Sequence, residues 1–526
     1  MRGLAQNPEE NSLKREYWLG DIDLRPAALF RIALGAFVLF DLLEFTPNLR
    51  AWFSDEGVFP RASFIANWAR TTRFVPMDAF GSPLLVWVYW GLAFVFAAMM
   101  LVGYRSRLAS FLTFVLMAGF QERLPPLFDG SDSVLRLMLF WNAFTRSGNL
   151  WSVDSLRAAA AGSPLPRKGP ALPVRLLQLQ PGWIYLCSII FKMEGSFWRN
   201  GTALHYVLHL DKVFTQPYLA FLGDIKPLVY IGSYGTLVVE GSFLALTLCP
   251  FYPRITRIIA MLEGTALHAG IGLSMRIGHF SYLMPLCYIP LFAPEWAQTI
   301  VSWASAKLVT PEWRTRWTEL ALKLPGPRVP SPGWIPRQTA TAALATVFVL
   351  TSWYSLPALP PNLQKYTPKP VTAFLTTLVD YASLWNSWDM FAPEPLHTDY
   401  HLTAPGELEN GVKINIFGGP DGEQRGFFFT RWWKYEENVI GGNQTLPLEW
   451  GRYVCREHNF HLAPGEPRLH TFQLVKEWQD IPELGKPWPA LQRTTIWSHV
   501  CYEDPKPGTV APKAQEKPLA ISLPAH

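Results

Sequence analysis

Long apolar stretches recur along the first two thirds of the chain and constrain its fold more than any other feature. A helix needs about 20 mainly apolar residues to cross the hydrocarbon core of a bilayer. Because hydrophobic residues make up 49% of the chain and charged residues only 17%, we predict a polytopic α-helical membrane bundle of about nine spans. The stretches are residues 27–46, 83–103, 107–125, 132–147, 177–197, 227–250, 255–275, 279–293 and 339–357.

Basic residues indicate how this bundle is oriented. Loops on the same side as the N-terminus carry roughly twice as many lysines and arginines as the alternate loops. Positively charged loops stay in the cytoplasm, so we predict a multi-pass protein of the inner (cytoplasmic) membrane with its N-terminus inside. With an odd number of spans, the C-terminal part is then extracytoplasmic.

The sequence pattern changes after the ninth stretch and divides the chain into regions. Short alternating runs replace long apolar ones, and residues 413–417, 418–422 and 426–433 suggest a strand, a turn and a strand. Two Pro-, Gly- and Arg/Lys-rich connectors, 156–173 and 308–338, are expected to be loops. The predicted regions are a cytoplasmic segment (1–26), a transmembrane domain (27–357), a transition segment (358–398), a β-rich extracytoplasmic domain (399–503) and a disordered tail (504–526).

The five cysteines fall into two classes. Cys187, Cys249 and Cys287 lie in apolar stretches, where a thiol usually serves as a small hydrophobic side chain. Cys455 and Cys501 lie in the polar C-terminal part and are disulfide candidates if that part is exported. Two free thiols are the alternative, because the sequence contains no information about their distance.

Ionisable residues inside the predicted spans are the first candidate functional group. Such residues cost a few kcal/mol to insert, so they face the bundle interior or a wet cavity. Internal salt bridges, for example of Arg31 or Arg136 with Glu240 or Glu263, are one interpretation. A lipid or substrate site is the other, and His268 is either a core histidine or a catalytic one. The group comprises Arg31, Asp41, Arg136, Glu240, Glu263 and His268.

A second group of polar residues lies near the predicted outer ends of the spans. Lys192 precedes Trp198 and is its most informative member. Its ammonium group could reach the interface and do nothing chemical. Held beside aromatic rings away from water, it could instead act as a base. The group comprises Asp129, Asp132, Lys192, Glu194, Arg276 and His279.

Simpler site signatures are absent from the sequence. It has no HExxH, GxSxG, P-loop or CxxC motif. His205 and His209 could share a helix face, but no third ligand is evident, so no metal is predicted. The net charge of +5 is spread over many loops and does not favour a nucleic-acid partner.

Short motifs follow one another in a characteristic order from about residue 20 to residue 400. They lie at residues 25–35, 53–61, 151–154, 192–198 with Gly201, 279–282, 291–296 and 387–393. This order resembles the vitamin K-dependent γ-carboxylases, and in particular their bacterial relatives with a horizontally transferred transmembrane helix (HTTM) domain.

The resemblance implies an active site at the outer side of the bundle, beside a pocket for a vitamin K- or menaquinol-type quinone. In the carboxylases, which are lyases, a lysine deprotonates reduced vitamin K, and the oxygenated product removes a proton from a glutamate γ-carbon that captures CO2. That lysine corresponds to Lys192, with Asp132, His268 or His279 assisting. A histidine that opens the fourth span in the carboxylases is replaced here by Asp132, which argues against γ-carboxylation itself.

The sequence is therefore compatible with two functions. The first is a quinol-dependent, γ-glutamyl carboxylase-like enzyme that modifies glutamate or another residue of an extracytoplasmic peptide. Its catalytic candidates are Lys192, Asp132, His268 and His279, and its lipid- or substrate-binding candidates are Arg31, Arg136, Glu240, Glu263 and Trp198. The second is a non-catalytic membrane scaffold or maturation factor that binds a secreted peptide. Membrane lipids are expected partners of either. A transporter is disfavoured because the sequence has no inverted repeat.

Overall fold

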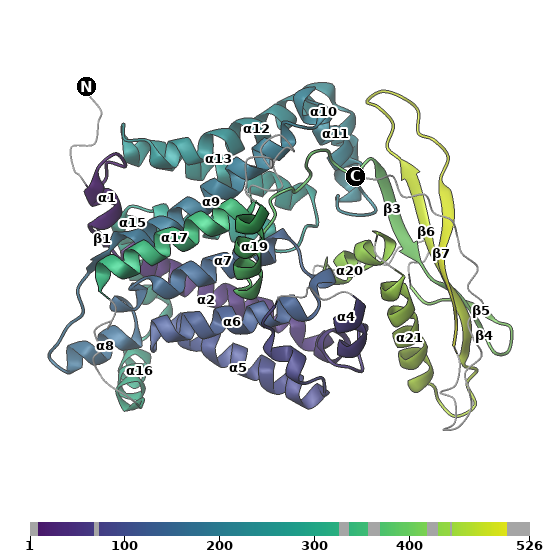
Figure 1. Ribbon diagram of the computed structural model, residues 1–526, viewed down its shortest axis with the longest axis horizontal. Helices are drawn as coiled ribbons and strands as arrows, with labels where there is room; N and C mark the ends of the chain where they lie inside the picture. Colours follow the sequence, from purple (N-terminus) through teal and green to yellow (C-terminus); the bar gives the residue numbers. More distant parts are fainter. Residues whose placement is uncertain are drawn as a thin grey trace.

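The structure is a computed structural model, and it describes residues 9–67, 73–325, 336–355, 369–417, 430–441 and 444–501. A bundle of helices forms the larger part, and a C-terminal sheet stands beyond one end of it (Figure 1). The short helix α1, Arg15–Leu19, lies at the end of the bundle far from the sheet. The first and last described parts of the chain are therefore at opposite ends of the molecule.

Each of the nine apolar stretches contains helix, but four helical segments are long and apolar enough to cross a membrane among the described residues. They are Arg25–Phe53, Pro83–Val102, Ala171–Lys192 and Lys226–Leu248. The chain is thus a multi-pass membrane protein, whereas nine spans are not shown. The bundle helices are α2 (Arg25–Phe45), α5 (Pro83–Val102), α6 (Ser106–Arg123), α7 (Gly130–Phe144), α9 (Ala171–Lys192), α12 (Lys226–Leu248), α13 (Pro253–Ser274), α14 (Phe280–Leu286) and α17 (Arg337–Ser355).

Length and polarity separate the remaining helices from these four. Helix α7 has only 15 residues, and α6 ends in the polar run Gln121, Glu122 and Arg123. Pro285 lies near the end of α14, which has seven residues and is followed by the 3-10 helix η6, Ile289–Leu291. A proline removes one backbone donor, so it breaks the regular helix that a single span needs.

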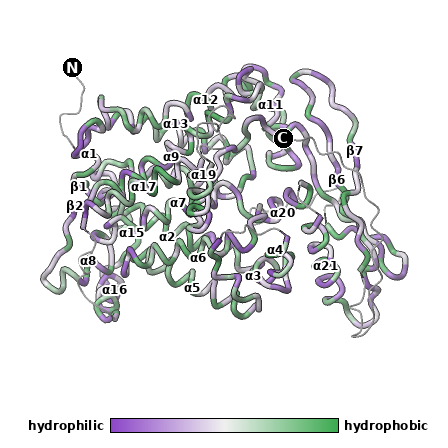
Figure 2. Tube along the Cα trace, viewed as in Figure 1, coloured by the Kyte–Doolittle hydropathy of each residue, from purple (hydrophilic) through white to green (hydrophobic). Residues whose placement is uncertain are grey.

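The four apolar segments differ in how much of their surface the protein covers. In its most apolar window α9 is 72% buried, against 28% for α5 and 22% for α12. Helix α9 is therefore central, while α5 and α12 present large apolar side chains such as Leu84 and Ile231 outward. Figure 2 shows apolar residues concentrated along the bundle helices. An apolar surface of this extent is suited to lipid rather than to water.

The connectors predicted as loops contain short regular elements, so that prediction is wrong in part. Ser152 caps α8 through a capping box with Ser155, and Thr310 caps α16. These hydroxyl groups satisfy free N–H groups at a helix start, which lets short polar helices form. The elements in the connectors are the end of α8 (Val153–Ala160), β2 (Lys168–Pro170) and α16 (Pro311–Lys323). Strand β2 pairs with β1 (Asp21–Asp23), and α15 (Pro294–Leu308) precedes the second connector.

The C-terminal sheet is antiparallel and is built around its longest strand, β6 (Leu469–Asp480). On one side β3 pairs with the second half of β6 and β4 with the first half, and on the other side β7 pairs along most of its length. Its other strands are β3 (Thr398–Thr403), β4 (Pro405–Leu408), β5 (Lys413–Asn415) and β7 (Gln492–Val500).

Two helices, α20 (Thr430–Gly441) and α21 (Thr445–Phe460), lie between the sheet and the bundle (Figure 1). The C-terminal region is therefore mixed α and β rather than purely β-rich. A disulfide joins Cys455 of α21 to Cys501 after β7, as the sequence allowed. It closes a loop whose ends are 46 residues apart in sequence.

The predicted strand at 426–433 is wrong for its described part, because residues from Thr430 onward form α20. Arg431, Tyr435 and Val439 are all buried at a spacing of four, which is the periodicity of one helix face. The rest of that stretch, the turn at 418–422 and the tail at 504–526 lie outside the described residues. The remaining helices are α3 (Leu49–Phe53), α4 (Arg61–Asn67), α10 (Ser196–Arg199), α11 (Ala203–Leu208) and α19 (Lys369–Tyr381).

Candidate functional site

A cavity of about 1060 Å³ opens between α9, α12 and α13 at the end of the bundle that faces the sheet. Most of its wall is apolar and includes Leu228, Val239 and Ile271. Polar side chains reach it from each of the three helices. These are Tyr185, Ser188 and Lys192 of α9, Glu240 of α12, and Glu263 and His268 of α13.

Lys192 is the last residue of α9 and is buried, with an exposed fraction of 4%. Its Nζ lies 2.6 Å from Glu240 Oε1 and donates to Ser188 Oγ at 2.6 Å. The Trp198 ring covers the same ammonium at 5.1 Å. Ser188 and Lys192 share a helix face because they are four residues apart. Lys192 thus points into the protein, which excludes the interpretation that it reaches the membrane interface.

A second polar group lies on the cavity wall beside this ion pair. Tyr185 Oη is 2.8 Å from His268 Nε2 and 2.5 Å from Tyr288 Oη, so three helical segments meet at one hydroxyl. Among the described residues, His268 Nδ1 and Glu240 Oε2 are buried without a hydrogen-bond partner. Glu263 accepts a hydrogen bond from Ser242 at 2.8 Å. Two buried polar atoms of residues that line the cavity therefore have no hydrogen-bond partner within the described protein.

The segment at 387–396 closes one side of this cavity and contacts the residues after Lys192. Trp198 Nε1 donates to the Phe391 carbonyl at 2.8 Å, and the Ser196 hydroxyl donates to Glu394 at 2.6 Å. The Ser196 hydroxyl lowers the pKa of the Glu394 carboxyl from its usual value. A Cβ on Gly195 would come within 1.8 Å of the Pro393 carbonyl oxygen, so only glycine permits this approach. Two of the motifs that define the resemblance thus pack together.

The salt bridges expected between the arginines of the spans and Glu240 or Glu263 do not form. Arg31 donates instead to the carbonyls of Met100 at 3.1 Å and Trp151 at 2.8 Å. Arg136 donates to Gln121 and to the Trp385 carbonyl, and its guanidinium lies 4.4 Å from the Trp385 ring centre. Arg31 thus joins the end of α5 to the loop at Trp151, and Arg136 joins α6 to the segment at Trp385. Neither arginine lines the cavity.

Asp132 and His279, predicted to assist Lys192, lie in a separate buried cluster around Arg431 of α20. Arg431 Nη2 is 2.6 Å from Asp41 and 3.1 Å from Asp132. Its Nε is 3.3 Å from Glu44, and His279 lies 3.3 Å from both Asp41 and Glu44. The guanidinium supplies the positive charge that three buried carboxylates require. Sequence analysis did not identify Arg431 or Glu44 as site residues. Arg431 lay in a run of residues that was interpreted as a strand.

Comparison with known proteins identifies the family to which this chain belongs. The HTTM domain family matches residues 21–296, slightly more than half of the chain. The protein belongs to the HTTM domain family. No curated protein and no solved structure was found to match the chain. HTTM proteins are related to the vitamin K-dependent carboxylases, as the motif order suggested.

The matched HTTM domain contains the whole Lys192–Glu240–His268 wall of the cavity, whereas the segment at 387–396 and Trp433 of α20 come from outside it. The cavity is therefore completed by parts of the chain that the family match does not cover. His268 and Glu263 line the cavity as candidate residues, and Arg31, Arg136, Asp132 and His279 do not.

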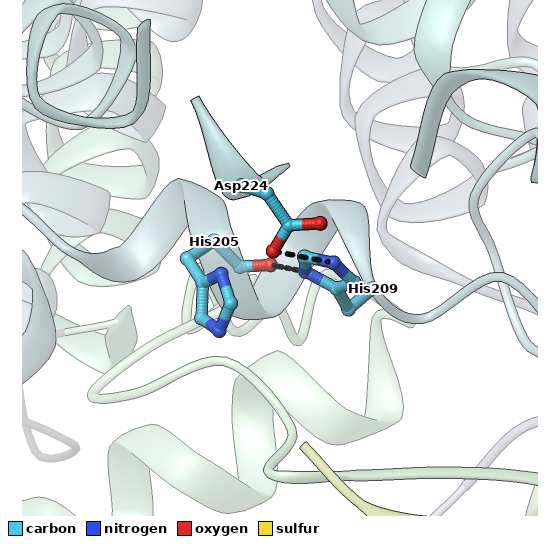
Figure 3. A group of neighbouring side chains, drawn as sticks. All are labelled: His205, His209 and Asp224. Atoms are coloured by element: carbon cyan, nitrogen blue, oxygen red, sulfur yellow. Dashed lines mark hydrogen bonds and ion pairs between the residues drawn. The ribbon is translucent and has the colours of Figure 1, made fainter. Parts of the chain in front are cut away.

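A further polar group in the HTTM domain joins His205, His209 and Asp224 (Figure 3). The sequence showed the first two at helical spacing but offered no third ligand. Asp224 ends the 3-10 helix η5, Pro217–Asp224, and its Oδ1 lies 3.4 Å from His209 Nε2. Only the packing of η5 against α11 brings the carboxylate there, so no local pattern could have identified it.

A pair of carboxyl groups connects the HTTM domain to the sheet. Asp399 of β3 is 2% exposed and accepts a hydrogen bond from the Lys212 backbone N–H at 3.1 Å. Burial, followed by the hydrogen bond and the charge of Asp211, raises the pKa of Asp399 to about 9. At neutral pH the Asp399 carboxyl therefore holds its proton and shares it with Asp211.

Proposed function

We propose that this HTTM protein is a membrane enzyme that uses a reduced, lipid-soluble quinone to modify glutamate or another residue of an extracytoplasmic peptide. The observation that carries the proposal is the cavity of about 1060 Å³, into which a buried lysine–glutamate pair faces. Small-molecule sites are mostly apolar concave surfaces with a few convergent polar groups. The cavity has this composition, and its end of the bundle faces the C-terminal sheet.

The residues present fit a quinone-type ring. Apolar side chains of α12 and α13 can surround a ring and an isoprenoid tail, while Lys192, Glu240 and His268 supply polar groups on the wall for a ring hydroxyl group. When bound, a quinol would supply the reducing power for the reaction. Lys192, Glu240 and His268 would hold its polar end, and Trp198 would exclude water from the ammonium group.

The Lys192–Glu240 pair would act as a unit in proton transfer. A lysine that is fully protonated cannot accept a further proton, so Lys192 must first pass one to Glu240. The 2.6 Å separation of Nζ and Oε1 allows this transfer without movement of either helix. The amine could then take a proton from a ligand hydroxyl, with Ser188 Oγ holding its orientation.

Quinone retention provides the first test. We expect purified protein to carry a lipid-extractable quinone, and we expect Lys192→Met and Glu240→Gln to reduce its amount at least about tenfold by loss of polar contacts. Mass spectrometry of the extract measures it. Lys168→Met is the matched control, because Lys168 forms an exposed ion pair with Glu9 at 2.7 Å, far from the cavity. Equal quinone in all four proteins would contradict the proposal.

The alternative is a non-catalytic scaffold or maturation factor that binds a secreted peptide. It is favoured by β7, which lies at an edge of the sheet and has exposed residues from Gln492 to Thr495. An extended peptide can add a strand to such an edge. The scaffold predicts that Thr494→Pro abolishes peptide capture while Lys192→Met leaves the biological activity intact. The enzyme predicts that Lys192→Met abolishes that activity.

The same proposal includes a topology. Helices α6, α7, α13, α14 and α17 would complete nine spans, with the N-terminus in the cytoplasm and the sheet outside. The separation of α1 and the sheet at opposite ends of the bundle supports this arrangement (Figure 1). The disulfide at the sheet end supports it too, because disulfides persist mainly in oxidising compartments.

A further inference from the structure

His205 of α11 and His209, which directly follows this helix, take no part in the proposed quinone chemistry. Both rings make hydrogen bonds to backbone carbonyls. His205 and His209 are 2% and 6% exposed, and Asp224 extends toward them from η5 (Figure 3). His205 Nδ1 lies 2.8 Å from the Gly223 carbonyl and its Nε2 lies 2.8 Å from the Pro482 carbonyl. His209 Nδ1 lies 2.8 Å from the His205 carbonyl.

These contacts fix the orientation of both rings. His205 faces two carbonyls, and His209 faces one carbonyl and the Asp224 carboxylate. The partners come from the end of η5, from the connection between β6 and β7, and from α11 itself. Three segments of the chain therefore hold the two imidazoles in place.

Two buried imidazoles and a carboxylate thus present three ligand atoms to a common point. From this geometry, we propose that His205, His209 and Asp224 form a binding site for a divalent transition metal ion of the zinc class. His205 gives up one of its two carbonyl contacts and keeps the other.

The distances suit such an ion. Ligand atoms about 2.0–2.1 Å from a tetrahedral zinc are roughly 3.3–3.4 Å apart. His209 Nε2 and Asp224 Oδ1 are already 3.4 Å apart, and the three ligand atoms lie within 4.8 Å of one another. The Nδ1–H of His209 donates to a carbonyl, which is how a metal-bound histidine is usually oriented. Two imidazoles and a carboxylate favour zinc-like ions over calcium or magnesium.

The surroundings indicate what the ion would do. A Cβ on Gly223 would lie 2.6 Å from His209 Cε1, so glycine is needed for the ring to reach its position. The Pro482 carbonyl, which contacts His205, belongs to the connection between β6 and β7. Leu204, Val207 and Leu208 of α11 line the large cavity. A bound ion would hold α11 and η5 together behind the cavity wall. Asp224, with a side chain 62% exposed, leaves one coordination position open to solvent.

Metal titration of the full-length protein in detergent tests the site. After a chelator has removed any bound metal, we expect the protein to take up one added Zn²⁺ per chain, measured by elemental analysis and calorimetry. Co²⁺ should give the visible absorption of a tetrahedral or five-coordinate complex. Asp224→Asn and His209→Ala should weaken Zn²⁺ binding by more than about tenfold.

His397→Ala is the matched control, because His397 is an exposed histidine that pairs with Glu394 rather than with this cluster. Asp224→Asn keeps the shape of the side chain, so its metal-free unfolding temperature should equal that of the unaltered protein. The proposal is overturned if the unaltered protein binds no more Zn²⁺ than His209→Ala, or if Asp224→Asn, still folded, binds it equally well. Because His205, His209 and Asp224 do not line the cavity, quinone retention reports separately on the proposed function.

Discussion

At the scale of single residues, the protein places charge where no water can stabilise it and supplies a specific partner each time. Lys192 is paired with Glu240, and Arg431 with Asp41, Glu44 and Asp132. Asp399 differs from these ion pairs, because its carboxyl group stays neutral and keeps its proton beside Asp211. Such groups carry functional information because each is costly unless its partner is present.

The Asp399 carboxyl makes the contact between β3 and the Lys212 segment sensitive to pH. Its folded pKa of about 9 is above the ordinary value near 3.9, so its contribution to stability is complete below about pH 4 and is lost as pH rises through 9. Asp399→Asn keeps a donor toward Asp211 at every pH. We therefore expect this variant to unfold at a higher temperature than the unaltered protein, by a margin that grows from pH 5 to pH 9.

Thermal unfolding in detergent at several pH values measures this margin. Asp480→Asn is the control, because Asp480 accepts a hydrogen bond from Thr398 at the exposed end of the same strand pair. A margin that stays constant from pH 5 to pH 9 would show that Asp399 ionises with its ordinary pKa.

At the scale of elements, Arg431 of α20 ties the C-terminal region to the bundle by buried ion pairs. Arg431 reaches carboxylates of α2 and α7, while Tyr435 and Val439 of the same face are buried below it. The rings of Phe45 and Phe128 lie 4.8 and 4.9 Å from the guanidinium. The position of the helix thus depends on a charge that aromatic rings shield from water.

Removal of this charge should release α20. Arg431→Met removes the guanidinium that contacts three buried carboxyl groups, and breaking a buried ion pair costs about 3–5 kcal/mol. We expect a lower unfolding temperature and faster proteolysis of the segment around α20 and α21. Limited proteolysis followed by mass spectrometry locates the cleavage.

Arg456→Ala is the appropriate comparison for this experiment. Arg456 also joins the C-terminal region to the bundle, through the Glu56 and Gly57 carbonyls, but at an exposed position. Its loss should change stability by less than about 1 kcal/mol. Equal protease resistance of Arg431→Met and the unaltered protein would show that α20 does not depend on the ion pair.

At the scale of the whole molecule, the disulfide reports on which side of the membrane the sheet lies. Cys455 and Cys501 can remain paired in an oxidising compartment and would be reduced in the cytoplasm. We expect both thiols to resist alkylation in intact cells until a reductant is added. Cys187 and Cys287 are buried in the bundle, so they should stay unmodified throughout unless the protein is unfolded.

Loss of the disulfide should also destabilise the C-terminal region. Closing a loop of 46 residues stabilises a fold by about 4 kcal/mol in the chain-entropy treatment. A Cys455→Ser, Cys501→Ser double variant should therefore unfold at a lower temperature than the unaltered protein, and its sheet should unfold before its helical bundle. Immediate alkylation of both thiols in intact, unreduced cells would place the sheet in the cytoplasm.

The sequence alone determined what depends on neighbours along the chain. The apolar stretches located the helices, the alternating run at 413–417 located a strand, and the motif order identified the family. Spacing also placed His205 and His209 on one side of the same segment, and composition made Cys455 and Cys501 a disulfide candidate. Periodicity and polarity are local properties, so a single segment contains them.

Only the tertiary structure decided which charges meet. Glu240 lies 48 positions from Lys192, and Asp41 lies 390 from Arg431, so their pairing depends on which helices pack together. The same holds for Asp224, which completes a group that two histidines only suggested. Coulombic attraction and hydrogen bonding act through space without regard to sequence order, and a buried charge takes whichever partner the fold brings within reach.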